Sequence, residues 1–239
     1  MTQSSTDASP PPSRPSEPLE AKRTLAGLLA EKQRRLERTR LLRYRPYAKQ
    51  RAFHAAGAQH RERLLMAGNQ LGKSYSGAAE TAIHLTGLYP EWWTGRRFRA
   101  APRLWAGSKT TEVTRDTCQR LLVGEPKDEA RWGTGFIPAE RLINWNRRSG
   151  SAANALDNVT VRHVSGATAT LGFKSYEQGR EKWQGETLDG VWMDEEPPLD
   201  IYVEAITRTN TTTGPIWITF TPLLGFSEVV RMFLEENPL

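Results

Sequence analysis

The stretch MAGNQLGKSYSG (residues 66–77) constrains the fold of this chain more than any other part of the sequence. It follows the short apolar run RLLM and precedes a helix-like stretch, and its core reads A-x-x-x-x-G-K-S. The usual pattern opens with glycine, whereas this one has Ala67 with Gly68 beside it. In a strand–turn–helix context, successive backbone N–H groups line an anion-binding concavity, and the helix N-terminus adds partial positive charge. The pattern therefore predicts a phosphate-binding loop.

Each residue of this loop has a predicted role. Gly72 allows the backbone to approach the phosphates, Lys73 reaches the β- and γ-phosphates as a catalytic residue, and Ser74 ligates Mg²⁺. The predicted nucleotide-binding residues of the loop are Ala67, Gly68, Asn69, Gln70, Leu71, Gly72, Lys73 and Ser74. The alternative is an ordinary strand–turn–helix junction with a solvated lysine.

A second apolar run, GVWM, ends in three carboxylates, Asp194, Glu195 and Glu196. In phosphate-loop ATPases an acidic residue on a neighbouring strand holds the Mg²⁺ shell, and a following glutamate activates water. We expect Asp194 to bind the metal and Glu195 to polarise water as the catalytic base, with Glu196 in reserve. The alternative is a helix start at Pro197, where acidic residues are favoured near a helix N-terminus.

Two weaker patterns flank these motifs. The run ITFTP contains Thr219 and Thr221, whose hydroxyls would sense the γ-phosphate if this strand lies beside the first one. The segment YRPYAKQRAFH contains Gln50, whose amide can donate and accept at an adenine edge, and Tyr47, which can stack on the ring. Ordinary β-propensity explains the threonines equally well, and a capped helix start after Pro46 explains most of the other segment.

The chain divides into three parts. Residues 1–18 are rich in Ser, Pro and Thr and are expected to be disordered. Residues 19–45 are expected to form a basic helical arm. Residues 46–239 alternate strand-like and helix-like stretches, which predicts an α/β domain with a mainly parallel sheet. The runs NVTVRHV and ATATLGFKS flank Ser165-Gly166 and alternate like a hairpin.

Charge is unevenly distributed. The formal net charge is +6, but the segment 20–51 alone carries eleven Lys/Arg against three Glu. This surplus favours a polyanion or an acidic partner near the N-terminus, although a solvated helix face explains it equally well. The only cysteine is Cys118, and neither an export signal nor a membrane span is recognisable, so a cytosolic protein is expected.

Four stretches taken together carry a resemblance. They are AGNQLGKS, PYAKQ, TFTP and, as the most specific, SYEQGREKWQGETLDGVWMDEEPP. In order and spacing they resemble the ATPase domain of the large terminase subunit of tailed bacteriophages, over residues 42–226. PYAKQ resembles the glutamine motif that reads adenine, and TFTP resembles the coupling motif that links hydrolysis to movement.

The resemblance implies a RecA-like phosphate-loop NTPase of the ASCE type, a three-layer sandwich around a mainly parallel sheet. It implies an ATP-hydrolysing motor that uses Mg²⁺ and threads double-stranded DNA into a procapsid. The implied partners are the portal protein, the small terminase subunit and further copies of the chain in a ring on the portal. The implied location is the cytoplasm of the bacterial host.

The sequence departs from the family in three places. Many relatives carry an arginine inside the phosphate loop, which is absent here, and an Arg-Gly pair where this chain has Gln184-Gly185. Arg180 is therefore the first candidate for the arginine that completes a neighbour's site, and Arg162 the second. Relatives usually continue into an RNase H-like nuclease domain, for which 239 residues leave no room. Nuclease activity is not predicted for this chain, and a truncation, a split gene and an isolated domain all stay open.

Two other function classes also stay open. A DNA helicase or remodelling ATPase of the commonest superfamilies needs a second RecA-like lobe, which the length excludes. A nucleotide-gated DNA-binding protein that does not turn over has no need of a water-activating carboxylate such as Glu195.

Overall fold

The computed structural model of the chain describes residues 17–150, 152–222 and 227–235. Within this range the helices are α1 (Glu17–Arg38), α2 (Ala48–Ala56), α3 (Lys73–Thr86), α4 (Thr111–Thr114), α5 (Arg120–Leu122), α6 (Leu199–Thr209) and α7 (Glu228–Glu235). The strands are β1 (Glu62–Met66), β2 (Arg103–Ser108), β3 (Leu142–Arg147), β4 (Leu156–Arg162), β5 (Thr168–Ser175), β6 (Gly190–Asp194) and β7 (Ile216–Phe220).

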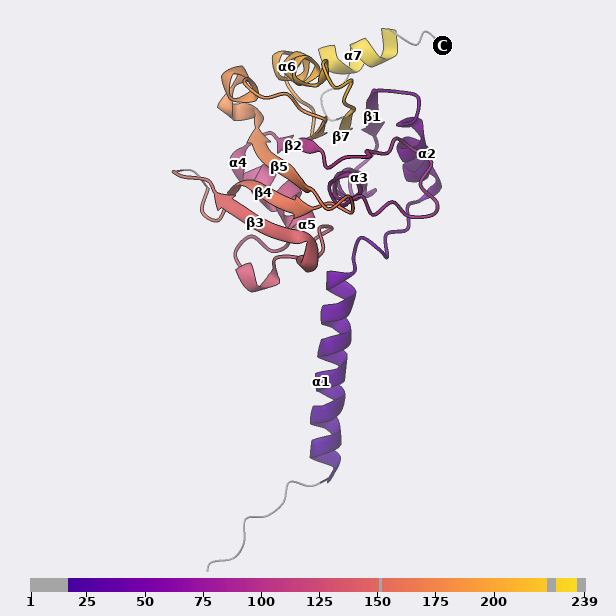
Figure 1. Cartoon of the computed structure of the whole chain (residues 1–239), viewed down its shortest axis with the longest axis vertical. Helices are drawn as coiled ribbons and strands as arrows, with labels where there is room; N and C mark the ends of the chain where they lie inside the picture. The colour runs from indigo at the N-terminus through magenta and orange to yellow at the C-terminus, as the bar shows by residue number, and fades with distance from the viewer. Residues whose placement is uncertain (1–16, 151, 223–226, 236–239) are drawn as a thin grey trace, which may run out of the picture. The chain divides into compact units, whose positions relative to one another are not determined.

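The described strands form one seven-stranded sheet in the order β1-β7-β6-β2-β5-β4-β3 (Figure 1). The pairs from β1 through β5 are parallel, and β5-β4 and β4-β3 are antiparallel. This confirms the predicted α/β class with a mainly parallel sheet. The predicted hairpin around Ser165-Gly166 is the antiparallel pair β4-β5.

Each face of the sheet is covered by its own apolar core. Side chains alternate along a strand, so Trp192 and Trp217 face the cluster that includes α3, whereas Val191 and Ile218 face the cluster that includes α6. Helix α3 packs on β6 and β7, and α6 packs on β6 from the opposite cluster and carries α7. The sheet thus lies between two helical layers.

Two local features set the position of α3. It ends at Gly87, which adopts the left-handed conformation, with φ 71°, that closes a helix. A Cβ placed on Gly77 would collide with the indole of Trp192. A glycine in mid-helix therefore allows α3 to approach the centre of the sheet closely.

The stretch that the sequence predicts as one helix between Thr110 and Gly124 is helical but not uniform. Thr110 caps α4, because its side chain accepts a hydrogen bond from the backbone N–H of Val113. The segment Arg115–Gln119 between α4 and α5 is a π-helix. One extra residue is therefore accommodated within the helix without breaking it.

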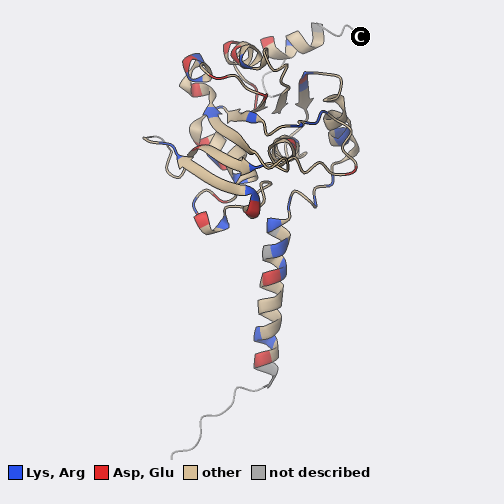
Figure 2. Ribbon diagram, viewed as in Figure 1, with Lys and Arg blue, Asp and Glu red and all other residues tan. Residues whose placement is uncertain are grey.

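The chain separates into two compact units, residues 1–36 and 37–239. Most of the predicted disordered tail lies outside the described residues, and α1 begins inside it, at Glu17. Helix α1 carries six Lys/Arg and four Glu, and both signs alternate along it in Figure 2. Residues 39–51 carry five Lys/Arg and no acidic residue. The basic surplus therefore lies mainly after α1, around α2.

A candidate nucleotide-hydrolysis site

The predicted phosphate loop connects β1 to α3, at the carboxyl end of β1. Gly72 has φ 76° and Gln70 has φ 59°, so two residues of the loop adopt the left-handed conformation. The Nζ of Lys73 donates a hydrogen bond of 2.6 Å to the carbonyl of Gly68, across the loop. Lys73 is only 8% exposed. The lysine is therefore held inside the loop and not solvated, which argues against an ordinary junction.

The sheet brings the first two motifs together. Strand β7 lies between β1 and β6, and its Thr219 is level with Leu65 of β1 on one side and with Asp194 of β6 on the other. Because parallel strands end at the same edge, Asp194 reaches the first turn of α3, where the Ser74 side chain lies close enough to lower the pKa of the Asp194 carboxylate. The predicted metal ligands Ser74 and Asp194 thus lie near each other.

Asp194 is a buried carboxylate. It is 1% exposed and accepts a further hydrogen bond of 2.8 Å from the Thr219 hydroxyl. Burial raises the pKa of Asp194 from 3.8 to about 6, and the hydrogen bonds from Ser74 and Thr219 oppose the rise. A carboxylate in this position favours a nearby cation.

Glu195 and Glu196 differ in their surroundings. Glu195 has φ 61°, a conformation that costs a non-glycine residue energy, and its backbone N–H donates to the Thr219 carbonyl at 2.8 Å. Its carboxylate is partly exposed and lies 3.9 Å from the Nζ of Lys109. Glu196 has one carboxylate oxygen buried without a hydrogen-bond partner, and burial raises its pKa. Both side chains are partly exposed, but only Glu196 has a carboxylate oxygen enclosed without a partner.

Tyr47 and Gln50 line an open pocket of about 480 Å³ beside the loop, together with Gly72 and Tyr75. Tyr47 is 73% exposed. The Gln50 amide accepts from the Tyr47 backbone N–H at 2.9 Å and donates to the Gly72 carbonyl at 3.1 Å. Gln50 therefore caps α2, as the alternative interpretation proposed, and also ties α2 to the phosphate loop.

The two threonines of β7 and its carboxyl end reach both halves of the site. Thr219 bonds to Asp194, as described, and Thr221 donates a hydrogen bond of 3.0 Å to the side-chain oxygen of Asn69 in the loop. The end of β6 is therefore connected through β7 to the phosphate loop.

Comparison with known proteins assigns the chain to a family. The family model described as "Terminase large subunit, T4likevirus-type, N-terminal" matches residues 64–238. The chain belongs to this terminase family. The large terminase subunit of Salmonella phage P22 is 43% identical over 228 residues, which cover 88% of this chain and 45% of that protein. The chain therefore spans about half the length of this curated relative.

Solved terminases have the same fold. The large terminase of a thermophilic bacteriophage is 12% identical with a TM-score of 0.56, and the match covers 80% of this chain and 43% of that one. The large terminase of bacteriophage HK97 is 15% identical with a TM-score of 0.54, and the match covers 81% and 36% respectively. At these identities the likeness extends to the fold and not to individual residues.

The arginines that the terminase resemblance singled out lie on other parts of the fold. Arg180 donates from Nε to Glu204 at 2.8 Å and is about half-exposed, and Glu204 is itself buried and also pairs with Arg208. Arg162 is an exposed residue at the end of β4. The contacts of the described residues join neither arginine to the phosphate loop of its own chain.

Sequence reasoning missed two residues of the site. Lys109 directly follows β2 and lies beside Glu195. The hydroxyl of Tyr176 lies 2.9 Å from the Asp194 carbonyl and 3.1 Å from that of Glu195, and it fixes the turn that carries both carboxylates. Lys109 was detectable as a polar residue at a strand end, whereas nothing local in the sequence marks Tyr176. No described helix is long and apolar enough to cross a membrane.

Proposed function

We propose that this site binds ATP with Mg²⁺ and hydrolyses it. The observation that carries the proposal is the placement of Asp194, at the end of β6, beside Ser74 at the start of α3 and the loop that encloses Lys73. A hydroxyl and a carboxylate that meet beside a phosphate loop are the metal-binding pair of phosphate-loop NTPases. This pair and the glutamate that comes after it support a RecA-like site of the ASCE class.

The residues present fit a magnesium ion. Ser74 and Asp194 would hold it, and the raised pKa of Asp194 reflects a buried carboxylate whose charge the nearby Lys73 does not fully offset. Among the described residues no three or more His, Cys, Asp or Glu form a metal-binding group. This agrees with Mg²⁺, which takes one or two protein ligands and completes its shell with phosphates and water. The ion would neutralise charge on the phosphate oxygens.

Lys73 and Glu195 would perform the chemistry. Lys73, held across the loop by Gly68, is positioned for charge that develops on the β- and γ-phosphates. Glu195 would accept a hydrogen bond from the attacking water and polarise it. The nearby Lys109 favours one orientation of the Glu195 carboxylate. Glu196 is the less favourable candidate for this role because one of its oxygens is enclosed.

Tyr47 and Gln50 would bind the adenine in the open pocket. The exposed ring of Tyr47 offers a stacking surface. Each end of the Gln50 amide makes one hydrogen bond in the structure, so its oxygen retains a lone pair and its nitrogen a second hydrogen for the base edge. The loop residues Ala67, Gly68, Asn69, Gln70, Leu71 and Gly72 would surround the phosphates.

We infer that hydrolysis drives DNA packaging, as the family name and the terminase relatives suggest. Thr219 and Thr221 would transmit the state of the γ-phosphate to the rest of the domain. Arg180 would leave Glu204 and complete the site of a neighbouring subunit in a ring on the portal protein. The further proposed partners are double-stranded DNA and the small terminase subunit, and the proposed location is the bacterial cytoplasm.

ATP hydrolysis measured with and without double-stranded DNA, beside a strand-separation assay, tests the proposal. A packaging ATPase hydrolyses ATP faster when DNA is present and does not separate strands. Strand separation would indicate a helicase instead. Slow hydrolysis that DNA does not stimulate would indicate a nucleotide-gated binding protein.

A further inference from the structure

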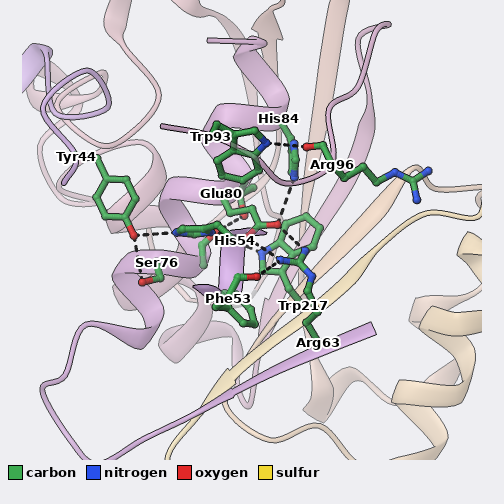
Figure 3. A network of polar contacts seen from close by, with 12 residues as sticks. Tyr44, Phe53, His54, Arg63, Ser76, Glu80, His84, Trp93, Arg96 and Trp217 are labelled. Atoms are coloured by element: carbon green, nitrogen blue, oxygen red, sulfur yellow. Dashed lines mark hydrogen bonds and ion pairs between the residues drawn. The ribbon is translucent and has the colours of Figure 1, made fainter. Parts of the chain in front are cut away.

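A cluster of buried ionisable side chains lies behind the phosphate-loop helix. Glu80 of α3 is 1% exposed and makes three contacts (Figure 3). Its carboxylate is 2.5 Å from Nη2 of Arg63 on β1, 2.7 Å from Nδ1 of His54 on α2, and 3.4 Å from Nε2 of His84 one turn along α3. Three elements, β1, α2 and α3, therefore meet at one carboxylate.

The cluster continues to the wall of the open pocket. Nε2 of His54 lies 3.0 Å from the hydroxyl of Tyr44, which donates to the Ser76 hydroxyl at 3.2 Å (Figure 3). Ser76 donates in turn to the carbonyl of Gly72 at 3.1 Å. Tyr44 lines the pocket beside the phosphate loop, so this path runs from Glu80 to the nucleotide-binding surface.

The same cluster fixes the backbone of α2. Nη1 of Arg63 donates to the Phe53 carbonyl at 3.0 Å, and His54 occupies the next position. Gln50 lies one turn earlier on α2 and contacts Gly72. Any movement of α2 against α3 would therefore displace Gln50 and the Tyr44 side of the pocket together.

Energetics argue that the cluster does more than hold the core together. Burial alone would raise the pKa of Glu80, but the charge of Arg63, the hydrogen bond from His54 and the nearby His84 ring hold it well below its usual range. Glu80 is thus ionised, and burying ions costs free energy that apolar packing of similar volume avoids. Directional hydrogen bonds, in contrast, fix one relative position and orientation for the groups that they join.

We propose that Glu80 and His54 are positioning residues that fix the nucleobase side of the pocket relative to the phosphate loop. They act through Tyr44 and through the backbone of α2, and they touch no part of the nucleotide. The proposal rests on the proposed function, since it takes the pocket to bind a nucleoside triphosphate. The phosphate side is held separately by the Lys73–Gly68 and Ser74–Asp194 contacts.

Two ligands separate the two sides of the site. ATP uses both the nucleobase side and the phosphate loop, whereas inorganic tripolyphosphate uses the loop alone. The test variant is His54→Phe, because the ring stays among its aromatic neighbours Phe53, Trp92 and Trp93 while both hydrogen bonds are lost. The matched control is His163→Phe, the same substitution at a buried histidine on the turn between β4 and β5.

Affinities are measured with Mg²⁺ by calorimetry on the full chain. In His54→Phe the affinity for ATP falls on the order of tenfold, the equivalent of one buried hydrogen bond, and that for tripolyphosphate is unchanged. His163→Phe changes neither. Because the loss of His54 also perturbs a buried ion, Tyr44→Phe, which removes one hydroxyl, is measured alongside and shifts ATP affinity in the same direction by less.

Equal weakening of ATP and tripolyphosphate in His54→Phe and Tyr44→Phe would overturn the proposal, because the cluster would then support the fold or the loop as a whole. Unchanged affinity for both ligands in both variants would overturn it as well. If the unsubstituted chain binds neither ligand, the proposed function fails first, and that outcome is recognised before any variant is compared.

Discussion

Thr219 Oγ1 donates a hydrogen bond of 2.8 Å to Asp194 Oδ1 and accepts one of 2.8 Å from the indole N–H of Trp192. A single hydroxyl thus connects the carboxylate at the end of β6 to the core of the domain. Strand β7 supplies this hydroxyl because it lies between the strands that carry the phosphate loop and the carboxylates.

Thr219→Val should therefore lower both stability and turnover. Valine keeps the shape of threonine but leaves the buried Trp192 N–H without an acceptor, at a cost of about 1–3 kcal/mol. We expect a lower Tm and a lower kcat with ATP affinity largely kept. Thr221→Val is the matched control for stability, because its bond to Asn69 is exposed. It should leave the Tm unchanged and reduce only the stimulation by DNA. Normal Tm and kcat in Thr219→Val would contradict this role.

Asp194→Asn should stabilise the ligand-free chain while abolishing its response to Mg²⁺-ATP. Folding raises the pKa of Asp194 from 3.8 to about 6, which corresponds to about 3 kcal/mol. The folded state therefore binds the proton more tightly, so the unsubstituted chain loses stability as pH rises from about 4 to 6. Asparagine does not titrate, so this loss of stability does not occur in the variant. The free energy of unfolding of Asp194→Asn therefore exceeds that of the unsubstituted chain by an amount that grows over this pH window and stays constant above it.

Urea unfolding in a chelator, at several pH values, measures this difference. Added Mg²⁺-ATP should stabilise the unsubstituted chain and not the variant. If Asp194→Asn is less stable than the unsubstituted chain at neutral pH, the Asp194 carboxylate stabilises the fold, and the expectation that its burial lowers the stability is wrong.

Glu195→Gln should retain ATP binding and lose turnover by about two orders of magnitude or more, as expected for loss of a general base. Glu195→Gly should be equally inactive but more stable by about 1 kcal/mol, because glycine adopts φ 61° without strain. Single-turnover hydrolysis and thermal unfolding measure the two effects. Glu196→Gln is the control and should keep most of the activity. If Glu196→Gln is inactive and Glu195→Gln is active, Glu196 and not Glu195 is the general base.

Residues 1–36 should be removable without loss of the fold. A deletion up to residue 45 is unsuitable, because Leu41 and Tyr44 are buried in the core. Residues 1–36 carry six Lys/Arg and four Asp/Glu, so their removal should change the salt dependence of DNA binding little. The double variant Lys49→Ala/Arg51→Ala should flatten the log–log slope by about 0.9 for each lost phosphate contact.

The outcome separates the interpretations of the N-terminal segment. A large fall in Tm with unchanged DNA stimulation would make the deleted segment structural. Lost stimulation with an unchanged Tm would make it the DNA contact and would contradict our expectation. If neither changes, the segment serves a protein partner absent from the assay.

The phosphate loop, the carboxylates and TFTP were readable from the sequence because each one follows or ends an apolar run. The turns at Gly72 in the loop and at Gly87 after α3 were also predictable, because each depends on the backbone conformation of the glycine itself. The position of β7 between β1 and β6 was not, because chain order does not determine strand order in a sheet. The contact of Thr219 with Asp194 depends on that order.

Contacts between elements that are distant in the chain could not be predicted from the sequence for the same reason. Glu80, Arg63 and His54 come from three elements, and nothing local marks them as neighbours. The sequence predicted that the positive charge belongs to a helical arm, whereas most of the surplus lies after α1. A count of charges over residues 20–51 contains no information on where the helix ends. The burial of Lys73 likewise depends on how the loop folds over its side chain.

The proposed function requires that the loop at residues 67–74 holds the phosphates of a nucleotide that this chain hydrolyses. The most direct measurement is steady-state ATP hydrolysis by Lys73→Met, with Tm recorded on the same sample. Methionine fills the space of the buried lysine stem but removes its charge and its hydrogen bond to Gly68, and Lys49→Met on the exposed face of α2 is the control. With DNA left out of the assay, we expect a normal Tm and hydrolysis at background in Lys73→Met, and full activity in Lys49→Met. Hydrolysis by a folded Lys73→Met at the rate of the unsubstituted chain would contradict it.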